Sequence, residues 1–250
     1  MMNRVVVIPA FNEAGTIRQV VSGCMPHVDR VIVVDDGSTD ATLEQLADLD
    51  VVSIRHPANL GKAASLQRGF HEALESGADW VVTLDGDGQH DPDEIPRLLQ
   101  AATDHPDTLI IAARLKQREQ APWLRRFANR FADFWVSWAA GYPVIDSQSG
   151  FRLYPASLLR AIRLDTPPEK GFVFESEILI EAASSNFYSR PIAVKSIYRK
   201  GGRDSHYLPW TDTWRIVRMI AGRLLRRGLY LQGLLGSLGL WADPRDKRTQ

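Results

Sequence analysis

The sequence predicts an α/β fold in which helices flank a mostly parallel sheet, with an amphipathic helical extension at the C-terminal end. Short β-branched runs recur through the first 112 residues, and segments with helical spacing of apolar residues separate them. Such alternation is typical of βαβ units, whose strands are parallel. Polar loops follow four of these runs, at the strand ends where open parallel sheets bind ligands.

Each element is predicted from its own local pattern. Residues 5–8 are β-branched and end at Pro9, which is typical of a buried parallel strand. Further strands are expected at 31–34, 51–54, 80–84 and 109–112, with extended segments at 149–155 and 191–198. Helices are expected at 13–25, 40–48 and 62–76, from Asp93, and at 121–140, 174–184 and 208–227. Ser38 or Asp40 is the expected cap of the second helix.

The 250 residues fit one main domain. We expect it at 1–205, followed by a basic amphipathic extension at 206–242 and a polar tail at 243–250. The single cysteine, Cys24, excludes a disulfide framework and suits a reducing cytoplasm. No secretory signal precedes the first strand, and no run approaches the roughly 18–20 apolar residues that span a bilayer. The expected location is therefore cytoplasmic.

The net charge of zero is the sum of two unlike parts. Residues 195–250 carry 12 basic and 4 acidic side chains, whereas residues 1–194 carry 18 basic and 26 acidic ones. Such asymmetry indicates that the basic part meets an anion. Trp210, Trp214 and leucines at helical spacing suit an anionic lipid surface, so nucleic acid is not the expected partner. The alternative is a helix pair packed on the core with its arginines reaching solvent.

The loop after the strand at 80–84 carries the strongest sign of chemistry. Asp85 and Asp87 stand two residues apart, and Gln89 adds a neutral oxygen. Two such carboxylates can share one Mg²⁺ or Mn²⁺, which takes its other ligands from substrate phosphate and water. The alternative is an Asp/Gly turn that caps the next helix. His90 is expected to hydrogen-bond locally, because oxygen ligands already suit a hard cation.

The other three loops suit a nucleotide. The carboxylates of residues 35–40 can accept hydrogen bonds from a ribose or a base, or else cap a helix. Phe11 and Glu13 suit a base, although Glu13 is equally a first-turn helix residue. Lys62 follows Gly61 at a helix start, where phosphate binds well. No P-loop is present and no Gly-x-Gly-x-x-Gly follows the first strand, so dinucleotide redox chemistry is not expected.

Together these loops resemble family 2 glycosyltransferases of the GT-A fold, the Rossmann-like fold of nucleotide-diphospho-sugar transferases. The motifs are VIPAFNE at 7–13, VDDGSTD at 34–40, NLGK at 59–62 and DGDGQH at 85–90. A fifth motif, DSQSGFRLY at 146–154, resembles the corresponding motif in one branch of this family. That branch contains dolichol-phosphate mannosyltransferase and the polyprenyl-phosphate glycosyltransferases of bacteria. The resemblance extends over residues 4–205.

The resemblance implies roles for individual residues. The implied metal ligands for Mg²⁺ or Mn²⁺ are Asp85, Asp87 and Gln89. The implied catalytic residues are Asp87, Arg114, Asp146 and Arg203. The implied donor-binding residues are Pro9, Phe11, Glu13, Asp36, Asn59, Gly61, Lys62, Asp85, Arg126 and Ser205. Arg125 and Arg130 are alternatives to Arg126.

The implied activity is inverting, metal-dependent transfer of a sugar from a UDP- or GDP-sugar to a polyprenyl phosphate or related lipid. The enzyme would be peripheral on the inner face of the cytoplasmic membrane. A phosphate acceptor is already ionised, whereas a saccharide or lipid hydroxyl would need a base. The candidate for that base is Asp146, with Asp91 as the alternative. The alternative for Asp146 is a turn or an ion pair with Arg152. The glutamates expected on a solvated or ion-paired helix face are Glu175, Glu177 and Glu181. A sugar-nucleotide-binding protein without catalysis is a further alternative.

Overall fold

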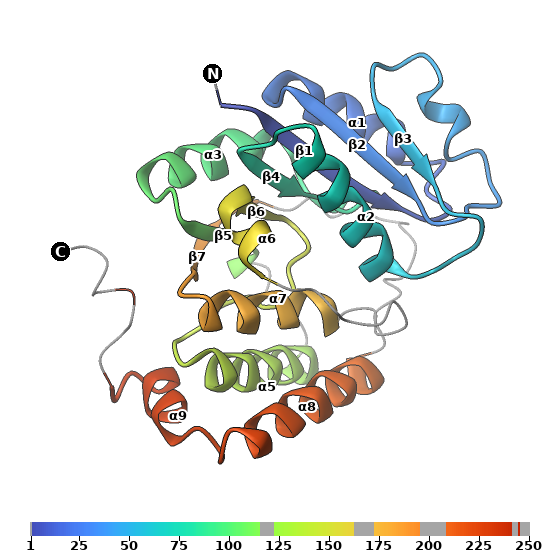
Figure 1. Cartoon of the computed structure of the whole chain (residues 1–250). Helices are drawn as coiled ribbons and strands as arrows, with labels where there is room; N and C mark the ends of the chain where they lie inside the picture. The colour runs from blue at the N-terminus through green and yellow to red at the C-terminus, as the bar shows by residue number, and fades with distance from the viewer. Residues whose placement is uncertain (1, 116–122, 163–172, 196–208, 242–244, 246–250) are drawn as a thin grey trace.

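A seven-stranded sheet forms the centre of the protein (Figure 1). The structure is a computed structural model that describes residues 2–115, 123–162, 173–195, 209–241 and 245. Within these residues the strand order is β3-β2-β1-β4-β6-β5-β7. The strands are β1 (Arg4–Ala10), β2 (Arg30–Asp35), β3 (Val52–Arg55), β4 (Trp80–Thr83), β5 (Thr108–Ala113), β6 (Arg152–Pro155) and β7 (Tyr188–Ala193). Only β6 runs antiparallel to its neighbours, so the predicted mostly parallel α/β fold is confirmed.

Helices cover both faces of the sheet (Figure 1). They are α1 (Ile17–Cys24), α2 (Lys62–Glu75), α3 (Ile95–Asp104), α5 (Trp123–Ala140), α6 (Ala156–Ala161), α7 (Val173–Ser184), α8 (Pro209–Arg226) and α9 (Leu231–Ser237). Short 3-10 turns lie at η1 (Met25–His27), η2 (Glu44–Leu46) and η3 (Pro92–Glu94). Most of the helices expected from the sequence are therefore present, with small shifts at their ends.

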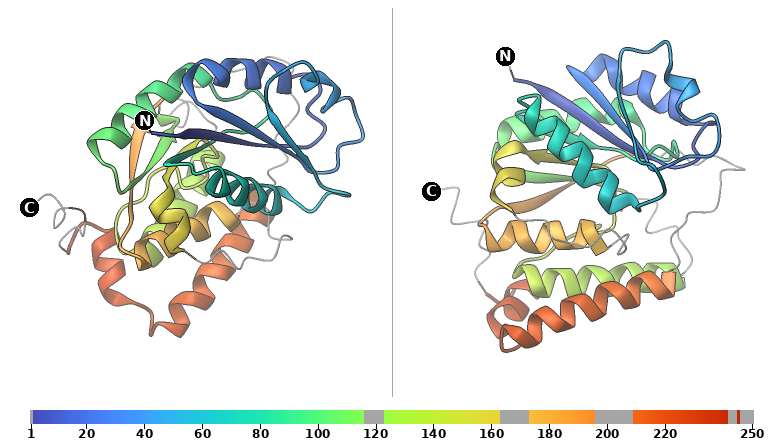
Figure 2. Two further views of the ribbon diagram at one scale, coloured as in Figure 1. Left: turned by 45° about the horizontal axis from the view of Figure 1, so that its top comes forward. Right: turned by 45° about the vertical axis from the view of Figure 1, so that its right-hand side comes forward.

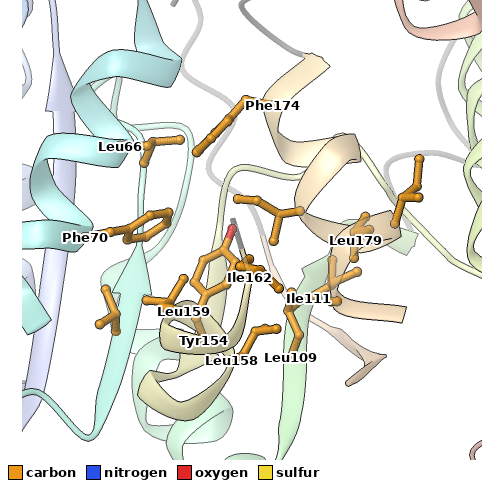
Figure 3. Packing of buried hydrophobic residues seen from close by; sticks show 14 of the residues in the cluster. Leu66, Phe70, Leu109, Ile111, Tyr154, Leu158, Leu159, Ile162, Phe174 and Leu179 are labelled. Atoms are coloured by element: carbon orange, nitrogen blue, oxygen red, sulfur yellow. The ribbon is translucent and has the colours of Figure 1, made fainter. Parts of the chain in front are cut away.

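Alternate side chains of the strands enter two separate cores, as the two-residue period of a strand requires. Val6 and Ile8 of β1 pack with α1 and α3 on one face. Val5 and Val7 point to the other face, where α2, α6 and α7 pack. Figure 3 shows Phe70 of α2 next to Tyr154 of β6 in this second core. The rings of Phe70 and Phe174 of α7 are stacked with centroids 6.4 Å apart. The ring centroids of Phe70 and Tyr154 are 5.2 Å apart.

The C-terminal extension is helical, as predicted, and packs on the domain. α5 contacts α7 on one side and α8 and α9 on the other, and Figure 2 shows α5 and α8 side by side. Val217, Ile220 and Leu224 form the buried side of α8. Trp138 Nε1 of α5 donates a hydrogen bond to the Leu229 carbonyl at 3.1 Å. None of the described helices combines the length and hydropathy of a membrane-spanning segment.

One predicted helix is wrong. Residues 40–48 form only the 3-10 turn η2 and flanking turns. The Asp40 carboxylate accepts hydrogen bonds from the Thr42 amide at 3.1 Å, from the Thr42 hydroxyl, and from the Ala14 amide at 3.2 Å. Local bonds from an aspartate to the backbone compete with the helical pattern, so this segment remains a turn.

The last strand begins earlier than the sequence predicts. The expected segment started at Pro191, whereas β7 spans Tyr188–Ala193. β7 lies at the edge of the sheet, where a proline without an amide hydrogen is tolerated. Proline therefore marks an edge strand here and not a strand start.

Candidate active site

The loops after β1 and β2 are joined by side-chain hydrogen bonds at the carboxyl edge of the sheet. The Asn12 amide donates to Ser38 Oγ at 2.8 Å, and Asn12 Oδ1 accepts from the Thr39 amide at 2.8 Å. The Glu13 amide donates to Thr42 Oγ1 at 2.8 Å. Asn12 has a φ of 56°, a left-handed conformation that asparagine tolerates. The structure therefore brings together two loops that the sequence predicted as a shared site.

Asp36 ties the third loop to the other two. Its buried carboxylate accepts hydrogen bonds from the amides of Leu60 at 2.9 Å and Gly61 at 2.8 Å. His56 Nδ1 lies 2.8 Å from the same carboxylate. Gly61 has a φ of 92°, which favours glycine. In this geometry Asp36 shapes the start of α2, and a contact between Asp36 and a nucleoside stays a prediction.

Lys62 opens α2 and lies between two carboxylates. Its Nζ is 2.7 Å from Asp85 Oδ1 and 2.9 Å from Glu175 Oε1. Burial alone would lower the pKa of Lys62, but the charges of Asp85 and Glu175 outweigh it and raise that pKa. Burial likewise acts to raise the pKa of Asp85, yet Lys62 and then His90 hold it well below its usual value. Both groups are therefore charged at neutral pH.

The motif at 146–154 closes the site behind this pair. The Thr83 hydroxyl donates to the Gly150 carbonyl at 2.7 Å, which attaches the motif to the end of β4. A Cβ at position 150 would lie 2.5 Å from Asp85 Oδ2 and 2.9 Å from Lys62 Nζ. Glycine is required there because the ion pair leaves no space for a side chain.

Asp87 completes a pair of carboxylates with Asp85. Burial first, and then the charge of Asp85, raise the pKa of Asp87, so the two carboxylates repel each other even with Lys62 beside Asp85. The Gln89 amide donates to Asp87 Oδ1 at 2.9 Å, and the Gln89 residue is exposed. His90 is buried, with Nε2 3.8 Å from Asp85 Oδ2.

A divalent cation fits this donor set if substrate completes its coordination. No group of three or more histidine, cysteine or acidic side chains that could hold a metal occurs among the described residues. Asp85 and Asp87 would therefore supply two oxygens. A diphosphate and water would supply the others, which is the usual arrangement for Mg²⁺ at a phosphate substrate.

Arg114, at the end of β5, is held next to the two aspartates by Asp146. The Arg114 amide donates to Asp146 Oδ2 at 2.9 Å, and Arg114 Nη2 donates to Asp146 Oδ1 at 3.2 Å. Burial would lower the pKa of Arg114, but Asp146, Asp85 and Asp87 together raise it. The guanidinium therefore lies in the field of both proposed metal ligands.

Arg152 is fully buried and holds the backbone of the site. Its guanidinium donates to the carbonyls of Ser149 at 2.8 Å, Glu175 at 2.8 Å and Ser147 at 2.6 Å. The alternative for Asp146 was a turn or an ion pair with Arg152. The turn is present, since the Ser149 amide donates to the Asp146 carbonyl at 3.0 Å, and the ion pair of Asp146 is with Arg114. Arg152 instead joins the 146–154 motif to the beginning of α7.

Comparisons with known proteins identify the family that carries this site. A family model described as glycosyl transferase family 2 matches residues 5–162. The chain belongs to glycosyl transferase family 2. It is an enzyme of the glycosyltransferase class, as the motifs predict.

Relatives with assigned names sharpen this similarity. The chain is 31% identical over 213 residues to the UDP-N-acetylglucosamine–dolichyl-phosphate N-acetylglucosaminyltransferase of Methanococcus voltae, covering 77% of this chain and 84% of the relative. It is 31% identical over 194 residues to the polyprenol monophosphomannose synthase of Mycolicibacterium smegmatis, covering 73% and 72%. These similarities support the predicted polyprenyl-phosphate branch of the family.

A solved structure supports the GT-A fold. Glucosyl-3-phosphoglycerate synthase from Mycobacterium tuberculosis, crystallised with Mn²⁺, UDP and glucosyl-3-phosphoglycerate, superposes with a TM-score of 0.61 at 20% identity. The match covers 90% of this chain and 80% of that one. At this identity the likeness shows the shared fold.

Most predicted site residues of this family 2 enzyme lie at one edge of the sheet. Pro9 lies near the end of β1, where its carbonyl would be 3.4 Å from a Cβ on Gly86, and Phe11 follows the strand. Arg126 and Arg130 lie on α5. The remaining predicted residues, Arg203, Ser205 and the side chain of Arg125, lie outside the described part of the chain.

Glu175 is a site residue that the sequence interpretation missed. It was expected on a solvated or ion-paired helix face with Glu177 and Glu181. The ion pairs are confirmed, because Arg223 binds Glu177 and Glu181 and Lys62 binds Glu175. Glu175, however, is only 3% exposed. Apolar residues occur on every side of the helix at 173–184, and a charged residue in such a helix is expected to be buried with a partner.

Proposed function

We propose that this enzyme transfers a sugar, with inversion, from a UDP- or GDP-sugar to a polyprenyl phosphate in a reaction that needs Mg²⁺ or Mn²⁺. The observation that carries the proposal is the pair Asp85 and Asp87 at the strand ends, with Lys62 and Arg114 in the same field. The acceptors named for the M. voltae and M. smegmatis relatives support a polyprenyl phosphate.

Asp85 and Asp87 would hold the divalent ion, and Gln89 is the proposed third ligand. When bound, the ion would neutralise negative charge on the leaving nucleoside diphosphate. The M. tuberculosis enzyme of the same fold, crystallised with Mn²⁺ and UDP, supports this choice of cofactor and donor. The residues proposed to surround the nucleoside are Pro9, Phe11, Glu13, Asp36, Asn59 and Gly61, with Arg126 and Ser205 as further donor contacts.

Arg114 is proposed to stabilise charge on the phosphates as the sugar leaves. Lys62 and Arg203 are proposed as further contacts to the phosphates. A phosphate acceptor attacks as an anion and needs no proton removed. Both carboxylate oxygens of Asp146 accept hydrogen bonds from Arg114, which supports a role for Asp146 in holding that arginine. Action of Asp146 as a base stays a prediction for the hydroxyl-acceptor alternative.

A test of the activity uses the purified full chain. We expect radiolabel from one member of a UDP- and GDP-sugar panel to enter the organic phase when undecaprenyl or dolichyl phosphate is supplied. The labelled product should be labile to mild acid, as a sugar phosphate ester is. Excess EDTA should abolish transfer, and added Mg²⁺ or Mn²⁺ should restore it. Undiminished transfer in EDTA would contradict the metal requirement, and label on a free saccharide alone would contradict the acceptor.

We further propose that the enzyme binds the inner face of the cytoplasmic membrane through an outer apolar surface on α5, α8, α9 and the residues that flank α9. Its exposed apolar residues are Trp123, Leu124, Phe127, Phe131, Phe134, Leu225, Leu229, Leu231, Leu235, Leu238, Leu240 and Trp241. Exposed arginines accompany them at positions 218, 226 and 227. Apolar side chains with neighbouring basic ones match an anionic lipid interface.

Binding to vesicles tests this surface. The double variant Phe127→Asp/Leu231→Asp is expected to bind vesicles with anionic lipid at least about tenfold more weakly. Each change removes an exposed apolar side chain that the lipid would bury on binding. Wild-type binding should also weaken as salt rises. Met2→Asp is the matched control, because Met2 is equally exposed but lies at the N-terminus, away from α5, α8 and α9 (Figure 1). Equal binding of both variants would contradict the proposed surface.

A further inference from the structure

Lys62 covers one oxygen of Asp85, a carboxylate that a divalent ion would need. Its ammonium lies 2.7 Å from Asp85 Oδ1, whereas Mg²⁺ binds a carboxylate oxygen at about 2.1 Å. The other oxygen, Oδ2, faces Gly150, where a Cβ would lie 2.5 Å away. An ammonium and a divalent ion on this one carboxylate repel each other strongly, because little solvent screens them. We therefore expect loading of metal on Asp85 to displace Lys62 from it.

The backbone at Gly150 limits the directions in which the Lys62 ammonium can move away from Asp85. A Cβ at Gly150 would lie 2.9 Å from Lys62 Nζ, so the backbone of the 146–154 motif stands directly against the ammonium. On another side lies Glu175, whose Oε1 is already 2.9 Å from Nζ. Lys62 can thus give up Asp85 by a small movement and keep its second carboxylate.

Glu175 is suited to bind Lys62 without help from Asp85. It is 3% exposed, and its Oε2 accepts no hydrogen bond from the described residues. A buried carboxylate with spare acceptor capacity is costly without a cation. An ammonium that leaves Asp85 would therefore gain a better contact with Glu175 instead of moving to solvent.

We propose that Lys62 is a built-in counter-ion for the metal site, which neutralises Asp85 in the metal-free enzyme and is transferred to Glu175 when a divalent ion binds. Glu175 is then a positioning residue that keeps the ammonium in the site, facing the donor phosphates. This inference rests on the proposed metal-dependent function and deepens it. Competition between Lys62 and the metal would also keep metal affinity low until a diphosphate adds its own ligands.

The test is Mn²⁺ binding without nucleotide, measured on the full chain from the electron paramagnetic resonance signal of free Mn²⁺. Lys62→Gln is expected to bind Mn²⁺ about tenfold more tightly than wild type, within the usual range of coupling between ligands. Glu175→Gln is expected to bind Mn²⁺ more weakly, because it removes the carboxylate that we propose receives Lys62. Lys62→Arg should stay close to wild type, since it keeps the competing cation.

The double variant separates exchange from simple electrostatics. If the two charges act only through their distant fields, their effects on Mn²⁺ affinity should add. If Glu175 acts by receiving Lys62, the effect of Glu175→Gln should disappear in the Lys62→Gln background. Additive effects, or no tightening in Lys62→Gln, would overturn the inference. Arg68→Gln on the same helix, an exposed cation paired with Glu72, is the control and should bind as wild type.

The result distinguishes this inference from the proposed function. If wild type binds Mn²⁺ in the presence of UDP but the Lys62 variants show no change, the metal site stands and the exchange is wrong. If no variant binds Mn²⁺ with or without UDP, the metal site itself is wrong. Circular dichroism and thermal unfolding check the fold of each variant. Lys62→Met replaces Lys62→Gln if that variant does not fold.

Discussion

Replacing Asp87 by asparagine is expected to lower the rate of sugar transfer by about 10²- to 10³-fold, the usual effect of removing one preorganised electrostatic contact. Asparagine keeps the shape of the side chain and loses its charge. Only one of the two paired carboxylates would then remain for the divalent ion. The measurement is the initial rate at saturating donor and acceptor, repeated over a range of Mn²⁺ concentrations.

The same change is expected to leave the metal-free protein as stable as wild type or slightly more stable. The pKa of Asp87 is raised in the folded state by burial and by Asp85, so its ionisation opposes folding at a pH above that pKa. Removal of the charge relieves this repulsion. Thermal unfolding in EDTA measures whether Asp87→Asn raises or lowers the stability of the metal-free protein. Asp93→Asn, at an exposed carboxylate on η3, is the matched control and should change neither quantity. Transfer by Asp87→Asn within tenfold of wild type would exclude Asp87 from the metal site.

Replacing Arg152 by lysine is expected to destabilise the protein by about 3–5 kcal/mol, the usual result of breaking a buried charged network. The guanidinium binds three carbonyls in three directions. The single nitrogen of a lysine ammonium cannot reach all three carbonyls, which Arg152 contacts with three different nitrogens. Each buried carbonyl left without a donor costs about 1–3 kcal/mol. The Ser147 and Ser149 backbone and the first turn of α7 would lose their shared anchor.

Urea unfolding measures this loss, and transfer activity reports on the site. The rate should fall with stability, because Gly150 and Glu175 both depend on segments that Arg152 holds. Arg160→Lys on α6 is the control. Arg160 is exposed, so its replacement should change the free energy of unfolding by no more than about 0.5 kcal/mol. A similarly small change for Arg152→Lys would contradict its role as the anchor of the motif.

The fold and the location of the site could be predicted because each depends on short, local patterns. The β-branched runs and the polar loops after them indicate parallel strands and a site at their carboxyl ends. These local rules placed the residues 9–13, 35–40, 59–62 and 85–90 at one edge, and the structure confirms that arrangement. They failed at residues 40–48, where side-chain bonds from Asp40 replaced a helix that the apolar pattern favoured.

The pairings inside the site could not be predicted in the same way. Lys62 meets Glu175, and Arg114 meets Asp146, because β6 runs antiparallel between β4 and β5 and brings the 146–154 motif against the parallel strand ends. The amino-acid sequence by itself determined which residue types lie at the ends of the strands. Only the tertiary structure decided which charges are buried together, since the partners lie far apart along the chain and their contact depends on how helices and strands pack.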